Sequence, residues 1–109
     1  MRKLILLLLI GTAMAQASHS VTLTWTDTAN PAGTTYTVKR SSGLCTGTPA
    51  FTTMATAVAG KGYTDLNVGV GNWCYVVTAV SAGVESVPSN LASVNVPPFA
   101  PVALTFTVK

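Results

Sequence analysis

The stretch that decides the fold reads WCYVVTAV and covers residues 73–80. Four of its residues share one parity, namely Trp73, Tyr75, Val77 and Ala79. Successive side chains of an extended chain point to opposite faces, so these four would lie on one face of a β-strand. We expect that face to point into a hydrophobic core.

The same two-residue period recurs on both sides of this stretch. The expected strands cover residues 21–26, 35–39, 51–57, 63–65, 73–80 and 84–96. Pro88 interrupts the last one, which a central strand tolerates only at a bulge. Turn-forming residues separate the segments, and no ten-residue stretch after the first fifteen residues has helical periodicity. This pattern is typical of an all-β sandwich or barrel. The residues expected in its core are Val21, Leu23, Trp25, Tyr36, Val38, Tyr63, Trp73, Tyr75, Val77 and Ala79.

Residues 1–15 have the features of a secretory signal peptide. A positively charged start precedes an apolar run at residues 4–10, and Ala13 and Ala15 offer a cleavage site. Crossing a bilayer takes about 20 apolar residues, so an uncleaved membrane anchor is the less favoured interpretation. We therefore expect a secreted or cell-surface protein whose single domain covers residues 16–96.

Cleavage of the signal peptide would leave a nearly neutral chain. Four basic residues against the three acidic ones give a net charge of +1. This balance provides no electrostatic reason to expect nucleic acid or an anionic membrane as a partner. The adjacent Lys39 and Arg40 are interpreted as the solvated end of a strand.

The chain contains two cysteines, Cys45 and Cys74. An even number of cysteines in an exported chain favours a disulfide over two free thiols. The bond would close a loop of about thirty residues and contribute roughly 3–4 kcal/mol of stability.

Side chains that could carry out chemistry are few. Beyond the signal peptide there is one histidine, His19, and there are three carboxylates, Asp27, Asp65 and Glu85. Their spacing requires neither an acid–base pair nor a metal cluster, so we interpret the carboxylates as turn and solvation residues and His19 as solvated. The sequence predicts no catalytic residue, no metal site and no cofactor, and we do not expect an enzyme.

Few aromatic side chains are available to bind a sugar by stacking. The tryptophans and tyrosines are expected in the core, which leaves Phe51 at a sheet edge and Phe99 and Phe106 near the C-terminus. Loops are then the remaining place for recognition on such a scaffold. The candidate loops cover residues 27–33, 41–49 and 81–84.

Five segments, taken in order, carry a resemblance to a known family. They read VTLTW (21–25), YTVKR (36–40), YTD (63–65), YVVTAV (75–80) and ESVPSN (85–90). Together they resemble a bacterial fibronectin type III domain. The resemblance implies an immunoglobulin-like sandwich with strands A, B and E facing strands C′, C, F and G. It places Trp25 in the core on strand B and Trp73 where the family usually has the tyrosine of its E–F corner. It also places Cys74 on the outward face of strand F and Cys45 in the loop before C′, on the same sheet.

Strand A of the family has no counterpart between the expected cleavage site and strand B. A strand-A-like segment follows the domain instead, after a proline-rich linker at residues 97–101. In this segment, residues 102–109, apolar side chains occupy every second position: Val102, Leu104, Phe106 and Val108. Strands A and G of the family run in the same direction, so the tail would leave at the end opposite to where strand A begins.

These observations motivate the hypothesis of donor-strand exchange, in which the tail of one copy completes the next copy. The alternatives are a tail that folds back or stays loose, and a fragment of a longer array. A monomeric adhesion module that binds a protein or a surface polysaccharide through its loops is the other functional interpretation.

Overall fold

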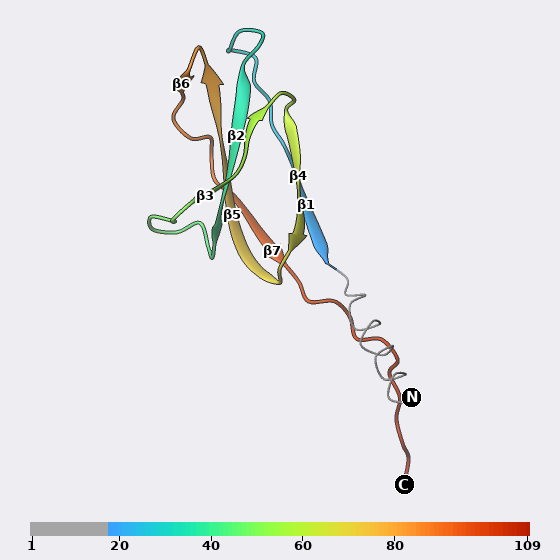
Figure 1. Cartoon of the computed structure of the whole chain (residues 1–109). Helices are drawn as coiled ribbons and strands as arrows, with labels where there is room; N and C mark the ends of the chain where they lie inside the picture. Colours follow the sequence, from blue (N-terminus) through green and yellow to red (C-terminus); the bar gives the residue numbers. More distant parts are fainter. Residues whose placement is uncertain (1–17) are drawn as a thin grey trace, which may run out of the picture.

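The computed structural model describes residues 18–109, and Figure 1 shows a two-layered β-sandwich with a C-terminal extension. Helices are absent from these residues. The strands are β1 (His19–Thr24), β2 (Thr35–Ser42), β3 (Thr52–Val58), β4 (Gly62–Val68), β5 (Gly71–Ser81), β6 (Val84–Glu85) and β7 (Ala92–Val96). The expected signal peptide at residues 1–15 lies outside the described residues.

The strands form two antiparallel sheets. β1 and β4 make the smaller sheet, and the larger one has the order β3-β2-β5-β6, with β7 also paired to β5. β6 and β7 occupy the two ends of the same edge of β5, because β2 lies along its other edge. The arrangement confirms the predicted all-β sandwich of two antiparallel sheets.

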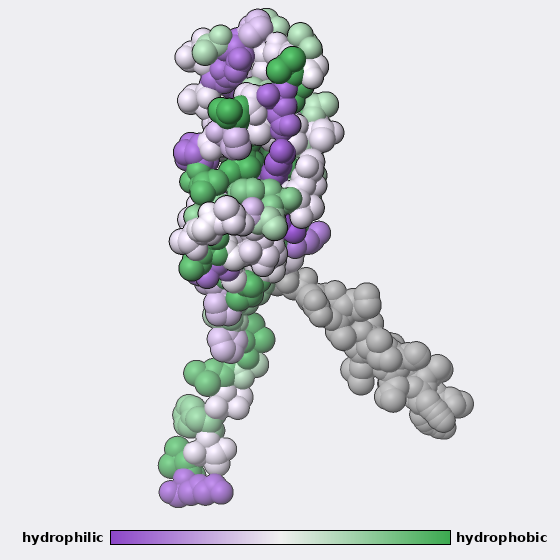
Figure 2. Space-filling view, turned by 90° about the vertical axis from the view of Figure 1, so that its left-hand side faces the viewer, coloured by the Kyte–Doolittle hydropathy of each residue, from purple (hydrophilic) through white to green (hydrophobic). Residues whose placement is uncertain are grey.

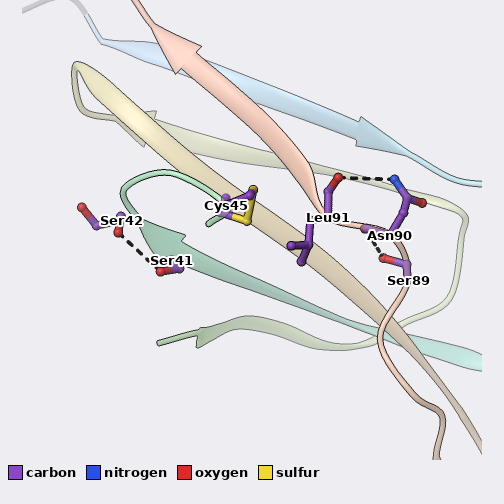
Figure 3. Close-up of a disulfide and its surroundings, with 7 residues drawn as sticks. Ser41, Ser42, Cys45, Ser89, Asn90 and Leu91 are labelled. Carbon is purple, nitrogen blue, oxygen red and sulfur yellow. Dashed lines mark hydrogen bonds between the residues drawn. A yellow bond between two sulfur atoms is a disulfide. The ribbon is translucent and has the colours of Figure 1, made fainter. Parts of the chain in front are cut away.

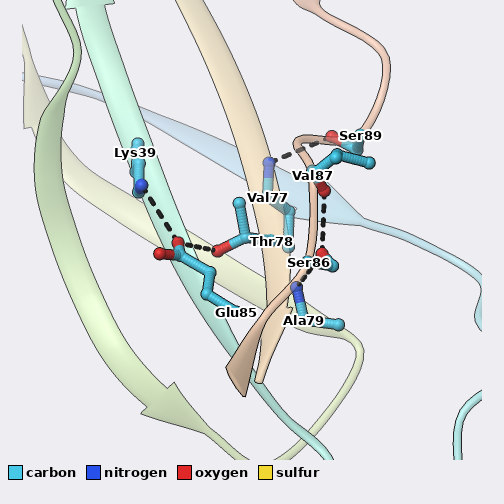
Figure 4. A network of polar contacts seen from close by, with 8 residues as sticks. All are labelled: Lys39, Val77, Thr78, Ala79, Glu85, Ser86, Val87 and Ser89. Carbon is cyan, nitrogen blue, oxygen red and sulfur yellow. Dashed lines mark hydrogen bonds and ion pairs between the residues drawn. The ribbon is translucent and has the colours of Figure 1, made fainter. Parts of the chain in front are cut away.

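The last predicted strand is divided into β6 and β7, and Pro88 lies in the break. Two serine side chains maintain the contact with β5 across this break, as Figure 4 shows. The Ala79 N–H donates to Ser86 Oγ at 2.9 Å, and the Val77 N–H donates to Ser89 Oγ at 3.0 Å. Side-chain hydroxyls thus accept hydrogen bonds from backbone N–H groups of β5. If β6 and β7 were one continuous strand, its backbone carbonyls would accept these bonds instead.

The interior between the sheets is only partly closed. Of the ten residues expected there, Tyr36, Val38 and Tyr75 have 5%, 0% and 1% of their surface exposed. The other seven are half-buried: Val21, Leu23, Trp25, Tyr63, Trp73, Val77 and Ala79. Val68 and Val96, which the sequence did not single out, are buried where β4 and β7 end. The two-residue period therefore located the inner face, whereas the depth of burial depends on what covers that face.

A disulfide joins Cys45 to Cys74, with 5.2 Å between the two Cα atoms (Figure 3). Cys74 lies on β5 between residues that face the interior, and it is fully buried. Cys45 belongs to the loop between β2 and β3, so the bond fastens this loop to the central strand of the larger sheet.

Candidate functional site

One edge of β1 has no partner strand within residues 18–109, because β4 is the only described strand that pairs with β1. On the paired edge, the Trp25 N–H donates to the Lys61 carbonyl at 3.1 Å. Hydrogen-bonding groups of consecutive residues point to alternate edges of a strand. The backbone N–H and C=O of Thr22 and Thr24 therefore point to the free edge, where an additional strand could bind them.

Two adjoining cavities open along this free edge, between β1 and the segment that connects β6 to β7. The upper cavity, near the end of β1, has a volume of about 230 Å³, and the lower cavity has a volume of about 90 Å³. Trp25, Val77 and Ser89 line both cavities, so the two form one continuous groove. We call it the edge groove, and its lining includes Leu23, Trp25, Tyr75, Val77, Ala79, Val87, Ser89 and Ala92. Several of these residues were expected to be core residues, so the edge groove is a part of the interior that is left uncovered.

Trp25 lies at the centre of the edge groove. Its ring meets the ring of Tyr36 edge-on, with 5.4 Å between the centroids. Its indole nitrogen Nε1 is buried and has no hydrogen-bond partner. A buried tryptophan N–H normally finds an acceptor, so the edge groove contains an unsatisfied donor.

The C-terminal tail, residues 97–109, extends away from the sandwich (Figures 1 and 2). The strand expected at residues 102–109 is not formed within the single chain. Its four alternating apolar residues are between 82% and 92% exposed: Val102, Leu104, Phe106 and Val108. A strand requires a partner for its backbone, so the pairing of this segment stays a prediction.

The start of the tail is held against the start of β1. The rings of His19 and Phe99 stack with 3.9 Å between their centroids and an interplanar angle of 6°. The interpretation of His19 as a solvated residue was therefore wrong, because its ring is half-buried and its Nε2 is buried without a partner. The stack fixes where the tail leaves the sandwich.

Asp65 is a buried residue that connects the two sheets, and its interpretation as a turn residue was wrong. Only 3% of its surface is exposed. Arg40 Nη1 donates to Asp65 Oδ2 at 2.8 Å, and the Tyr75 hydroxyl donates to the same oxygen at 2.7 Å. Burial and the hydrogen bond to Asp65 raise the pKa of Tyr75. The parity of Asp65 could have revealed this role, because Tyr63 on the same strand was expected to face inward.

Arg40 was also misinterpreted, since it is not a solvated strand end. Its guanidinium lies over the ring of Trp73, 4.3 Å from the centroid, and is paired with Asp65. Trp73 in turn donates from Nε1 to the Gly69 carbonyl at 2.8 Å. The indole thus makes a side-chain hydrogen bond at the position where the family usually has the tyrosine of its E–F corner.

The third carboxylate, Glu85, forms an ion pair with Lys39, with 3.0 Å between Nζ and Oε2 (Figure 4). Thr78 Oγ1 donates to the same oxygen at 2.6 Å. The hydrogen bond from Thr78 and the ion pair with Lys39 hold the pKa of Glu85 below its usual range. Both partners lie on the larger sheet, so these contacts hold β6 against β5 and β2.

Asp27 organises the turn that follows β1. Its carboxylate accepts hydrogen bonds from the backbone of Ala29 and Asn30 at 3.1 Å, from the Asn30 side chain at 2.7 Å and from the Tyr36 hydroxyl at 2.7 Å. The bonds from Asn30 and Tyr36 hold the pKa of Asp27 well below its ordinary value. Asp27 is therefore the turn residue that the sequence predicted.

This lowered pKa predicts an acid-dependent loss of stability. The contribution of ionised Asp27 is fully present above its unfolded pKa of about 3.9 and is lost as the pH falls toward the lower folded value. Asp27→Asn is expected to destabilise the protein most at about pH 7 and by a smaller amount at about pH 2.5, where the carboxyl group of the unfolded chain is largely protonated. Urea unfolding at the two pH values measures this. An equal loss at both would show that the charge is not responsible.

Within residues 18–109 no group of three or more His, Cys, Asp or Glu side chains could hold a metal ion. The same residues contain no helix long and apolar enough to cross a membrane. The described carboxylates contact the partners given above, and the edge groove is lined mainly by apolar and hydroxyl side chains. Fold and site together define a structural or interaction module built on a β-sandwich.

Comparison with known proteins places this module in a family. A solved structure, that of an Fn3-like protein from Clostridium thermocellum, is 40% identical to the chain. The match covers 75% of this chain and 81% of that one, with a TM-score of 0.59. The chain belongs to the fibronectin type III-like family, whose fold is typically non-catalytic. No family model matches the sequence, and no curated protein matches it.

Proposed function

We propose that this chain is a secreted, non-catalytic module that assembles head to tail by donor-strand exchange. The observation that carries the proposal is a pair of complementary features at opposite ends of the sandwich. The upper cavity of the edge groove lies where β1 ends, and the tail leaves where β1 begins (Figure 1). In the assembly, apolar side chains from the tail of one copy enter the edge groove of the next.

The direction of the chain favours exchange between copies over self-closure. β7 ends beside the start of β1, and the tail continues away from the sandwich. A strand antiparallel to β1 must begin at the other end, beside Trp25. The tail of a copy stacked above reaches that end in the correct direction, whereas the chain's own tail would have to turn back along the whole sandwich.

The gain from exchange has two parts. Burial of all four apolar side chains, Val102, Leu104, Phe106 and Val108, would contribute roughly 6–10 kcal/mol before the cost of ordering the tail, and burial of only some of them contributes correspondingly less. The entering backbone also satisfies the free N–H and C=O groups of Thr22 and Thr24. The contact joins two different surfaces, so it propagates into an open filament unless the rotation between copies closes a ring.

The disulfide supports the extracellular part of the proposal. Disulfides persist in oxidising compartments such as the cell exterior and the periplasm. A bond between Cys45 and Cys74 therefore agrees with export through the signal peptide predicted at residues 1–15.

Assembly is tested with two matched variants of the full-length, oxidised chain. Leu104→Asp/Phe106→Asp places charges on the apolar side of the tail, and Thr105→Asp/Thr107→Asp places the same charge on the other side. Multi-angle light scattering over a range of concentrations measures the mass of each. We expect the wild type and the threonine variant to grow into oligomers and the apolar-side variant to stay a monomer, because a charge in the edge groove would be buried without a partner.

Two results would overturn the proposal. One is a wild-type mass that stays at that of a single chain at every concentration. The other is an equal effect of the two variants, which would show that the apolar side of the tail has no special role.

A further inference from the structure

We infer that the edge groove accepts the tail in one register, in which Phe106 lies beside Trp25 and Val108 lies beside Leu23 of the next copy. The inference rests on the proposed donor-strand exchange and specifies which residues recognise each other. In this register, donor and acceptor residues run antiparallel, so Thr107 lies opposite Thr24.

The shape of the edge groove distinguishes the possible registers. A tail that enters from the upper end meets the cavity of about 230 Å³ first and the cavity of about 90 Å³ second. Residues two positions apart in a strand are about 7 Å apart, which suits adjoining cavities that share Trp25 and Val77. The entering strand must therefore present a large apolar residue followed two positions later by a smaller one.

Among the four alternating apolar residues of the tail, only one pair has this order. Val102 is smaller than Leu104, and Leu104 is smaller than Phe106, so both of these pairs increase in size along the chain. Phe106 followed by Val108 decreases in size. Phe106 therefore fits the upper cavity and Val108 the lower one, which agrees with the general rule that cavities and overpacking both destabilise an interior.

A contact at the start of β1 excludes a further register. If Val102 lay beside Trp25, Val108 would lie beside His19. The ring of His19 is already covered by Phe99 of its own chain, at 3.9 Å between centroids. In the inferred register the apolar side of the tail reaches Leu23 and leaves this stack undisturbed.

The unsatisfied Trp25 N–H also suits an entering strand. Nε1 is buried, unpaired and part of a residue that lines both cavities. A strand brings a row of main-chain carbonyls along the edge groove, and one of them can accept this hydrogen bond after a rotation of the indole that exposes Nε1 to the groove. An apolar ligand without an acceptor would leave the donor unsatisfied, at a cost typical of a buried polar group.

Disulfide trapping tests the register in the full-length chain. Thr24 is exposed on β1, and a cysteine there can be combined with a cysteine at one of three tail positions. Thr24→Cys/Thr107→Cys represents the inferred register, and Thr24→Cys/Thr105→Cys and Thr24→Cys/Ala103→Cys represent shifts of two and four residues. Residues that lie directly opposite each other in a hydrogen-bonded pair of antiparallel strands have Cα atoms about 5.5 Å apart. A disulfide can span this distance. The native cysteines are already bonded to each other, and no other cysteine is free in the described chain.

After oxidation, the Thr24→Cys/Thr107→Cys variant is expected to give a ladder of covalent oligomers on a non-reducing gel. The two variants that represent shifted registers are expected to give no such ladder. A ladder strongest in a shifted variant would overturn the register and leave strand exchange intact. Absence of a ladder in all three, while light scattering shows oligomers, would overturn exchange through the edge groove and the register with it. A monomer cross-linked to itself would show that the tail folds back, which overturns both proposals.

Discussion

Replacing Asp65 with alanine is expected to lower the free energy of unfolding by about 3 kcal/mol at neutral pH. The substitution removes the acceptor for Arg40 and Tyr75 and leaves a guanidinium without its partner between the sheets. Removal of one partner of a buried ion pair costs about 3–5 kcal/mol in general. The lower value applies here because 23% of the Arg40 side chain is exposed to water. Urea unfolding followed by tryptophan fluorescence measures the change.

Two further variants separate charge from packing at this position. Asp65→Asn keeps the shape and an acceptor oxygen, so its loss is expected to be smaller than that of Asp65→Ala. The double variant Asp65→Leu/Arg40→Met replaces the pair with apolar groups and is expected to recover part of the lost stability, because the buried Tyr75 hydroxyl still lacks its acceptor. A loss below about 1 kcal/mol for Asp65→Ala is typical of an exposed ion pair and would contradict the role assigned to this residue.

Removing the disulfide in the double variant Cys45→Ser/Cys74→Ala is expected to cost about 3–4 kcal/mol. The bond joins residues 29 positions apart, and breaking it enlarges the conformational freedom of the unfolded chain. Folded domains typically have about 5–15 kcal/mol of stability in total, so the loss is large for a domain of this size. The midpoint of urea unfolding is expected to fall accordingly.

Reduction of the wild type provides the control for this substitution. Cys74 has no exposed surface, so a reductant is expected to act after partial unfolding. Wild-type protein unfolded in the presence of reductant should then show the same midpoint as the double variant. Equal midpoints for the oxidised wild type and the double variant would mean that the bond does not stabilise the fold.

In the proposed assembly, the stability of a single copy would depend on the same residues that bind the tail. Val77 and Ala79 of β5 line the edge groove and are half-buried in the free chain. An entering strand would cover them, so the unfolding midpoint of the wild type is expected to rise with protein concentration, as it does when a partner binds only the folded state. Assembly would thus complete a core that one chain leaves open.

The sequence by itself determined the fold class and the inner face of the strands. The alternation around Trp25, Val38 and Tyr75 depends only on the extended backbone, which turns each side chain to the face opposite its neighbour. The two cysteines and the alternating tail could be recognised in the same way, because composition and spacing are local properties of the chain. The segments that resemble a fibronectin type III domain then supplied the order of the strands.

Only the tertiary structure decided which polar residues are buried and where the sandwich stays open. Asp65 looked like a turn residue until the opposing sheet placed Arg40 and Tyr75 beside it. The stack of His19 on Phe99 joins residues at the two ends of the domain, and no local pattern connects them. Partners across the interior depend on the register of strands that are distant in sequence, and an unfilled edge is visible only after all the described strands are in place.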